Sequence, residues 1–327
     1  MKSLPTGVDD SDVVRAVAEG WGIVASSAEH LAVGFGSYHW IVTDEGQQRF
    51  FVTVDDLGTK AWLGDTCDDA FAGLRKAFGI AAILRDKAGL GFVLAPLPAA
   101  DGESVRRLGL CHSVAVFPFV DGAASDFGDS IGPEQRVEMV RLLVRLHQAT
   151  PTVPMDQPLE LGFAGRAGLE AAIRDVDRTW VGGPFAEPAR AWLAGHAGDL
   201  GRLLDDFDQV VRTVATTQQT PVITHGEPHP GNVIRSNGNL LLIDWDTVAL
   251  APPERDLWLL ATDSGEEVAL YREATGHEVN NDALSLYRQA WDLADIAVYL
   301  DQFRSSHQRT ADTQDAWTYL ENSIRHD

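Results

Sequence analysis

Acidic, amide and imidazole side chains gather at two turns in the last third of the chain. His225, Glu227 and Asn232 lie in a stretch rich in glycine and proline that follows a short apolar run. A second apolar run, residues 240–243, ends directly on Asp244. Because turns and strand ends carry these side chains, a hairpin can bring their polar atoms into one small volume. Oxygen ligands of this kind suit Mg²⁺, which keeps several waters and shares substrate phosphates.

The elements that must position these side chains are two strands joined by a tight turn. Residues 237–239, Asn-Gly-Asn, separate the apolar runs 233–234 and 240–243, which is the pattern of a β-hairpin. We therefore predict a hairpin with Asn232 just before its first strand and Asp244 at the end of its second. The alternative is a Gly/Pro turn and a polar hairpin in an ordinary α/β domain.

The whole pattern, His-Gly-acid, four residues, Asn, a hairpin and Ile-Asp-Trp-Asp, resembles the aminoglycoside phosphotransferase family. The resemblance implies that Glu227 is the catalytic base, that Asn232 binds metal and that Asp244 is the main metal ligand. It also implies that His225 orients the loop and that Asp256 braces it; a carboxylate at a helix N-terminus is a compatible plain explanation for Asp256. The chain departs from the family at Glu227, where the family usually has Asp.

The same resemblance implies an α+β, protein-kinase-like fold with two lobes. We expect a small nucleotide-binding lobe with an antiparallel sheet at 1–116, a hinge at 117–121 and a larger, mostly helical lobe at 122–327. The hinge pattern is closer to the spectinomycin-kinase branch than to the kanamycin-kinase branch. Local patterns predict strands at 30–33, 38–43, 49–54, 91–97 and 113–119, and helices at 9–20, 68–86, 133–148 and 282–304.

Two segments are candidates for binding ATP or GTP. Gly34, Gly36 and Ser37 form a Gly-x-Gly hairpin whose backbone N–H groups could lie over nucleotide phosphates. The alternative is a tight turn without a ligand. The hinge residues Phe117 and Phe119 are expected, from the resemblance, to offer backbone groups to the base. A strand that leaves the sheet through a proline turn would explain the hinge segment equally well.

The lysine that grips nucleotide phosphates in the family is missing from its usual strand. The matching position is Thr53, and the following helix, 68–86, contains no Glu to pair with such a lysine. The nearest unassigned cation past this strand is Lys60, which follows an acidic turn that could fold it back over the site. A solvated loop residue is the alternative explanation for Lys60.

The chain is strongly acidic, with a formal net charge of −22 and a pI near 4.7. Such a surface repels nucleic acid and anionic membranes and attracts cationic ligands, although solubility alone would also explain it. From the resemblance, acids of the last long helix would meet ammonium groups of the substrate, and the candidates are Asp292, Asp295 and Asp301. A solvated helix face is the alternative for each of them.

The predicted function is Mg²⁺-dependent transfer of the γ-phosphoryl group of ATP, or GTP, to a hydroxyl of a small cationic molecule. An aminoglycoside or aminocyclitol is favoured, as in antibiotic resistance. One alternative is a catalytically weak, nucleotide-binding relative, which Thr53 and Glu227 would explain. Another is a metabolic kinase for a small alcohol. We expect no nucleic-acid or membrane partner, and a monomer or a homodimer.

Cysteine usage and the N-terminus bear on the compartment. Cys67 and Cys111 lie far apart without metal-ligand spacing, which favours a reducing compartment and argues against a disulfide framework. Residues 1–5 lack the apolar run of a signal peptide, and no stretch approaches the length of a membrane span. We therefore expect a cytoplasmic protein.

Overall fold

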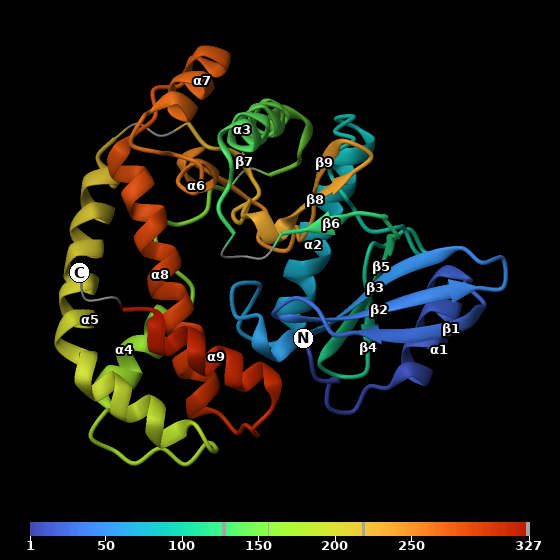
Figure 1. Cartoon of the computed structure of the whole chain (residues 1–327), viewed down its shortest axis with the longest axis horizontal. Helices are drawn as coiled ribbons and strands as arrows, with labels where there is room; N and C mark the ends of the chain where they lie inside the picture. Colours follow the sequence, from blue (N-terminus) through green and yellow to red (C-terminus); the bar gives the residue numbers. More distant parts are fainter. Residues whose placement is uncertain (126–128, 156, 218–219, 325–327) are drawn as a thin grey trace. The chain divides into compact units, whose positions relative to one another are not determined.

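The computed structural model describes residues 1–125, 129–155, 157–217 and 220–324 (Figure 1). The chain forms two compact units, which are treated separately below. The first combines Met1–Leu159 with Gln219–Asn280, and the second combines Glu160–Gln218 with Asn281–Asp327. The hinge expected at 117–121 lies inside the first unit, so the expected lobe boundary stays a prediction.

The first unit begins with an antiparallel sheet of five strands in the order β1-β2-β3-β5-β4. These strands are β1 (Ala25–Leu31), β2 (Ser37–Asp44), β3 (Arg49–Asp56), β4 (Arg106–Leu108) and β5 (His112–Pro118). The central strands β3 and β5 are rich in valine and phenylalanine, which fit a pleated, buried surface. The small antiparallel sheet expected at the N-terminus is therefore confirmed.

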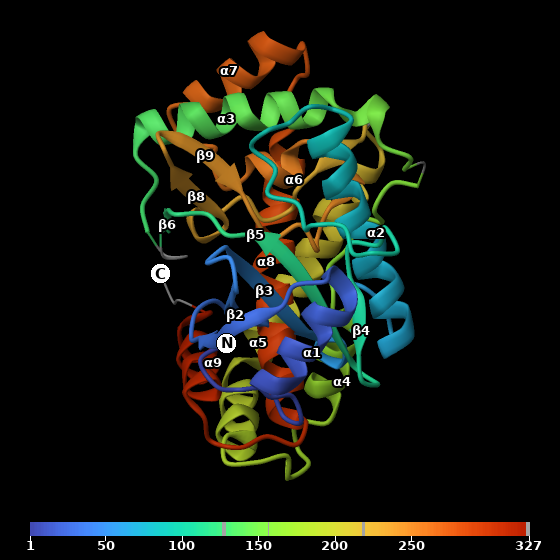
Figure 2. The same ribbon diagram turned by 90° about the vertical axis from the view of Figure 1, so that its right-hand side faces the viewer.

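The sheet has a helix on each face (Figures 1 and 2). Under α1 (Asp10–Trp21) lie Trp40, Val42, Val52, Val54, Val114 and Val116. Under α2 (Cys67–Asp86) lie Phe51, Ala115 and Phe117, in one cluster with Leu74 and Phe78. Because alternate side chains of a strand point to opposite faces, Thr53 and Asp55 belong to the same face as Phe51.

Two predicted strands differ from the structure. The apolar run 91–97 is no strand and makes only an isolated bridge, between Val93 and Leu242. The run makes short backbone hydrogen bonds to Leu242 and to Val116, which belong to different strands, and Pro96 lacks the N–H group that a continuous ladder needs. The first strand is β1, at Ala25–Leu31 instead of 30–33, because its polar residues hide the alternation.

The cysteines also contradict the prediction. Cys67 and Cys111 form a disulfide, with their Cα atoms 5.3 Å apart, although 44 residues separate them in sequence. The pairing of β5 with β3 brings the turn after β4 to the start of α2, and sequence spacing gives no sign of this contact. The expectation that both thiols stay reduced is therefore wrong for this structure.

The remainder of the first unit carries the predicted hairpin. Its elements are β6 (Ala123–Ala124), α3 (Pro133–Gln148), β7 (Val222–Thr224), β8 (Val233–Ser236), β9 (Asn239–Leu242), β10 (Ala249–Ala251), α6 (Glu254–Leu257) and α7 (Glu266–Thr275). Strands β8 and β9 pair antiparallel across Asn237 and Gly238, whose φ angles are 49° and 80°. Positive φ at both positions is what a two-residue turn of this hand requires, so the predicted hairpin is confirmed.

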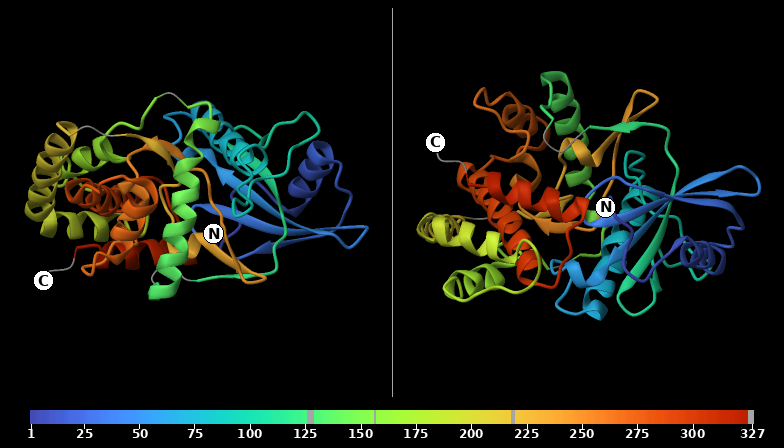
Figure 3. Two further views of the ribbon diagram at one scale, coloured as in Figure 1. Left: turned by 90° about the horizontal axis from the view of Figure 1, so that it is seen from above. Right: turned by 60° about the horizontal axis from the view of Figure 1, so that its bottom comes forward.

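The second unit is helical in its described residues. Its helices are α4 (Arg166–Arg174), α5 (Ala186–Ala215), α8 (Asn281–Arg304) and α9 (Ala311–Asn322). Helices α5 and α8 run side by side (Figures 1 and 3). The helix predicted at 282–304 is α8, and its apolar stripe is buried and comprises Leu286, Ala290, Leu293, Ala297 and Leu300. None of the helices in the described ranges is both long and apolar enough to cross a membrane.

Two glycines of α2 should respond in opposite ways to alanine. A Cβ on Gly73 would press on the backbone carbonyl of Leu63, whereas among the described atoms nothing lies within 4 Å of a Cβ on Gly79. Gly79→Ala should raise the free energy of unfolding by up to about 1 kcal/mol, the helix-propensity gain. Gly73→Ala should lower it by about 1–3 kcal/mol, because the loop before α2 must shift. Urea unfolding of both variants checks this, and a stabilised Gly73→Ala would contradict the tight packing.

Candidate active site

A buried carboxylate holds the loop that follows β7. Asp256, in α6, accepts hydrogen bonds from the backbone N–H groups of His225 (2.9 Å) and Gly226 (2.6 Å). His147 Nε2 lies 3.0 Å from Asp256 Oδ2, and His147 Nδ1 lies 2.7 Å from the Tyr271 hydroxyl. Burial raises the pKa of Asp256, but the hydrogen bond with His147 and the charge interactions with His147, His225 and Arg255 together more than offset this, so the pKa is below its ordinary value. Asp256 therefore sits where a brace for the loop would be.

His225 connects the loop to the end of β9. Its Nε2 donates to the carbonyl oxygen of Ile243 (2.8 Å), and its Nδ1 accepts from the backbone N–H of Glu227 (3.2 Å). Burial lowers the pKa of His225, which keeps the ring neutral and allows one nitrogen to donate while the other accepts. The ring thereby orients the backbone at Glu227, whose side chain is partly buried.

Asn232 comes just before β8 and Asp244 just after β9, so both lie at the open end of the hairpin, as the sequence predicts. Asn232 is buried, and its Nδ2 donates to the Glu227 carbonyl (3.0 Å), which leaves its side-chain oxygen as the possible ligand. Asp244 has a φ of 62°, unusual for a residue with a side chain, and such backbone strain clusters at functional sites. Although the Asp244 side chain is exposed, desolvation by the surrounding chain, and then the neighbouring Asp246, raise its pKa.

These residues fit a magnesium ion. Asp246 is buried and Asp244 is exposed beside it, the charge of Asp246 disfavours ionisation of Asp244, and a divalent cation would relieve that repulsion. The available donors are carboxylate and amide oxygens, which Mg²⁺ prefers. Within the described ranges no group of three or more His, Cys, Asp or Glu side chains is arranged to hold a metal, so the carboxamide of Asn232 would have to complete the set.

Lys60 is the buried cation of this site. Its side chain is 3% exposed, and its Nζ lies 2.8 Å from Asp246 Oδ2 and 3.1 Å from Asp55 Oδ1. Nζ also donates to Ser37 Oγ (3.3 Å), which in turn donates to Asp55 (2.6 Å). Burial would lower the pKa of Lys60, but the charges of Asp246 and Asp55 reverse this and raise it, so the group is an ammonium. The alternative of a solvated loop residue is wrong.

Asp55 and Asp246 are the site residues that sequence reasoning missed. Asp55 lies two positions after Thr53 on β3, so both side chains face the same side of the sheet. This alternation of side chains along a strand was the sequence signal that could have identified Asp55. The hydroxyl of Thr53 is buried and has no hydrogen-bond partner among the described residues. Asp246 is 186 residues from Lys60, and no local pattern indicates that contact.

The other nucleotide-binding candidates lie at a turn and at a strand end. Gly34 and Gly36 have φ angles of 73° and 82° in the turn before β2, which starts at Ser37. The ring of Phe117 is in the core under α2, and that of Phe119 lies 3.9 Å from the guanidinium of Arg49. Both rings are thus engaged, and only backbone groups of this segment are available for a base. Their role stays a prediction.

The three candidate substrate acids lie on α8, in the second unit. Asp292 and Asp301 are exposed, and Asp295 is partly buried. Burial, followed by the charge of Asp292, raises the pKa of Asp295 to about 7. Asp295 therefore changes its charge near neutral pH. Its role toward a substrate stays a prediction.

The hydrogen bonds from the His225 and Gly226 backbone to Asp256 lead to a prediction for the substitution Asp256→Asn. An amide can accept from one of the two backbone N–H groups, but its NH₂ then faces the other. Leaving one buried donor unpaired should lower the free energy of unfolding by about 1–3 kcal/mol. Denaturant unfolding measures this, with Asp86→Asn as control, since Asp86 is exposed at the end of α2. Equal stability of the two variants would contradict the brace.

Comparison with known proteins gives the family. A family model described as "Phosphotransferase enzyme family" matches residues 27–309. The "Protein StrN" of Streptomyces griseus is 30% identical over 250 residues, which are 73% of this chain and 73% of that protein.

Two solved structures share the fold. A spectinomycin phosphotransferase in complex with ADP and spectinomycin aligns with a TM-score of 0.71 at 18% identity, over 97% of this chain and 94% of that one. A microcompartment-associated aminopropanol kinase aligns with a TM-score of 0.61 at 15% identity, over 96% and 95% of the two chains. The kinase-like fold is confirmed. Because the family model covers most of the sequence and StrN is 30% identical to it, the chain belongs to the phosphotransferase enzyme family and is a kinase with a hydroxyl acceptor.

Proposed function

We propose that this kinase moves the γ-phosphoryl group of ATP, or GTP, to a hydroxyl of a small molecule that carries an amine. The observation that supports it best is the buried Lys60 ammonium beside Asp246, at the hairpin that also presents Asp244. A buried cation at this place gives nucleotide phosphates a counter-charge although Thr53 occupies the usual lysine position. This arrangement favours an active enzyme over a weak, nucleotide-binding relative.

Phosphoryl transfer asks a protein mainly for positioning and for electrostatic stabilisation. A magnesium ion bound by Asp244 and Asn232 would neutralise charge on the phosphates. Lys60 would bind phosphate oxygens while Asp55 keeps its amine in place. Glu227 would accept the proton of the attacking hydroxyl, on a loop that His225 orients. These roles follow from atoms of the first unit only.

The preference for an amine rests on charge. The chain carries a formal net charge of −22, so a cationic substrate is attracted over a long range. On α8, Asp292, Asp295 and Asp301 would supply carboxylates for ammonium groups. An antibiotic of the aminocyclitol type is the first candidate. An amino alcohol is the second, since the aminopropanol kinase has the same fold and a name that specifies an amine with a hydroxyl.

A phosphorylation screen tests the proposal. Release of ADP or GDP would be followed with aminocyclitols, aminoglycosides, amino alcohols and uncharged polyols as acceptors. We expect turnover only with acceptors that carry both an amine and a hydroxyl, and none with Asp244→Ala. Nucleotide binding without turnover on any acceptor would favour the weakly active relative, and turnover on polyols alone would favour a kinase of neutral alcohols.

Glu227 should be essential to the chemical step. Glu227→Gln keeps the size of the side chain but cannot accept a proton, so kcat should fall by at least about a hundredfold, the lower range for loss of a general base. KM should change little. Steady-state kinetics on the best acceptor measures this, with Glu273→Gln as control, because Glu273 is an exposed acid of α7. Turnover of Glu227→Gln near the wild-type rate would show that Glu227 is not the base.

Asp295 should make substrate affinity depend on pH. Since the pKa of Asp295 is raised to about 7, KM for an amine substrate should fall as its carboxyl ionises between slightly acidic and slightly basic pH. In Asp295→Asn that fall should be lost while kcat changes little. A wild-type KM that is independent of both pH and ionic strength would contradict the charge-based preference.

The same residue offers a check that needs no substrate. A carboxyl whose pKa is raised by folding destabilises the native state as pH rises from the unfolded pKa to the folded one. Asp295→Asn should therefore raise the melting temperature at pH values above the folded pKa and change it little near the unfolded pKa. Calorimetry at both pH values decides this. An equal effect at both would mean that Asp295 is not perturbed.

A further inference from the structure

We propose that the Cys67–Cys111 disulfide is a redox site that sets nucleotide affinity, because it fixes the segment that carries Lys60. The proposal rests on the phosphate-binding role proposed for Lys60 and adds regulation to it. The segment is residues 57–66, which connect β3 to α2.

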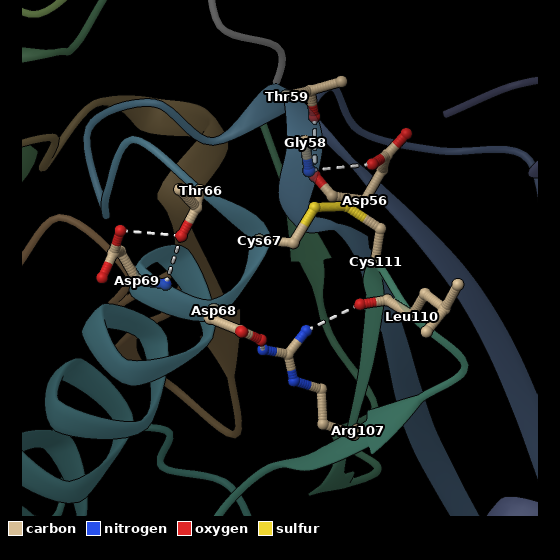
Figure 4. The surroundings of a disulfide bond; sticks show 10 residues. All are labelled: Asp56, Gly58, Thr59, Thr66, Cys67, Asp68, Asp69, Arg107, Leu110 and Cys111. Carbon is tan, nitrogen blue, oxygen red and sulfur yellow. Dashed lines mark hydrogen bonds and ion pairs between the residues drawn. A yellow bond between two sulfur atoms is a disulfide. The ribbon is translucent and has the colours of Figure 1, made fainter.

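Both ends of this segment are attached to the same turn. At its start, the backbone N–H of Leu57 donates to the carbonyl oxygen of Cys111 (2.8 Å). At its end, Cys67 is the first residue of α2, and its sulfur is bonded to that of Cys111 (Figure 4). Cys111 lies in the turn between β4 and β5, so this turn closes the base of the loop that presents Lys60.

Inside the segment the other backbone hydrogen bonds are local, such as that of the Gly58 N–H to Asp56 Oδ1 (3.0 Å), while Leu57 and Leu63 pack in the core under α2. The N–H of Lys60 donates to Leu57 over 3.4 Å, and the N–H of Leu63 donates to Lys60 over 2.9 Å. The ammonium itself is placed by Asp55 and Asp246. Since a charged hydrogen bond depends steeply on geometry, a shift of the segment would weaken the ion pairs that place Lys60 and its contact with phosphates.

A second set of contacts would keep α2 docked after reduction. Arg107, on β4, pairs with Asp68 of α2 and donates to the Leu110 carbonyl (2.9 Å) (Figure 4). Its guanidinium also lies over the ring of Phe71 (4.5 Å). Reduction should therefore loosen the segment without unfolding the unit. The expected effect is a graded change in nucleotide affinity.

The chemistry is thiol–disulfide exchange. One thiolate of a small dithiol attacks a cysteine sulfur, the other cysteine leaves as a thiolate, and the second thiol of the reagent then breaks the mixed disulfide. Two electrons pass to the protein, both cysteines become thiols, and the reagent becomes a cyclic disulfide. A small disulfide such as oxidised glutathione reverses the reaction. Both cysteines are partly buried, and the neighbouring Leu110 is 94% exposed, so the turn is open to such reagents.

The test compares the affinity of the full chain for Mg·ATP in two redox states. The protein is treated with dithiothreitol or with oxidised glutathione, the reagent is removed, free thiols are counted, and Mg·ATP is titrated by calorimetry. We expect two thiols to appear on reduction and the Kd to rise about three- to tenfold, a partial loss of a charged hydrogen bond. Oxidation should restore the affinity. The Cys67→Ser/Cys111→Ser variant should match the reduced protein and ignore both reagents.

Adenosine, which has no phosphates, controls for general damage to the fold. Its Kd should be the same in both redox states. A parallel loss of adenosine and ATP affinity would mean that the disulfide stabilises the whole unit, and would overturn the proposal. So would an unchanged Kd for Mg·ATP when two thiols have appeared, or a failure of the oxidant to remove them.

A variant of Lys60 separates this proposal from the proposed function. Lys60→Met is combined with Asp55→Asn, which removes one charge of each sign from the buried cluster. If the disulfide acts through Lys60, this variant binds Mg·ATP weakly in both redox states. An equal response of variant and wild type to reduction would overturn the proposal. Unaltered affinity of the variant in the oxidised state would instead refute the phosphate-binding role of Lys60.

Discussion

The buried ammonium of Lys60 is the constraint on which the rest of the site depends. Asp55, Asp244 and Asp246 all act on its charge. Lys60, Asp55 and Asp246 are buried, and withdrawing each such ion from water costs on the order of several kcal/mol. Three carboxylates can share this small volume only if cations share it with them. Lys60 is the protein's own cation. Because it balances only part of the negative charge, the site can also accept a divalent ion together with anionic phosphates.

The first unit stabilises its buried carboxylates in two different ways. Asp256 is satisfied by backbone N–H groups of the loop and by His147, all of which are fixed by packing. That arrangement gives both carboxylate oxygens hydrogen-bond partners within the protein. Asp246, in contrast, is paired with a cation that nucleotide phosphates can also attract. The first mode holds the loop after β7 in place, and the second keeps charge available for the proposed ligand.

Short sequence patterns predicted part of the fold and part of the candidate site. The Asn-Gly turn fixed the hairpin because both residues tolerate positive φ, and the spacing of leucine and alanine on α8 marked its buried face. Contacts between distant segments were not predictable. The disulfide and the Lys60–Asp246 pair depend on how strands pair and helices dock, and neither leaves a periodic signal. The run 91–97 is apolar because it is largely buried, but its backbone hydrogen bonds are divided between Leu242 and Val116 and form no continuous strand ladder.

The most direct test is a crystal structure of the protein with Mg²⁺ and a non-hydrolysable ATP analogue. The account predicts Lys60 Nζ within about 3 Å of an α- or β-phosphate oxygen, a normal charge-assisted hydrogen bond, with Asp55 still holding the amine and the metal on Asp244. A structure in which Lys60 keeps only its carboxylate partners, while another cation meets the phosphates, would contradict it.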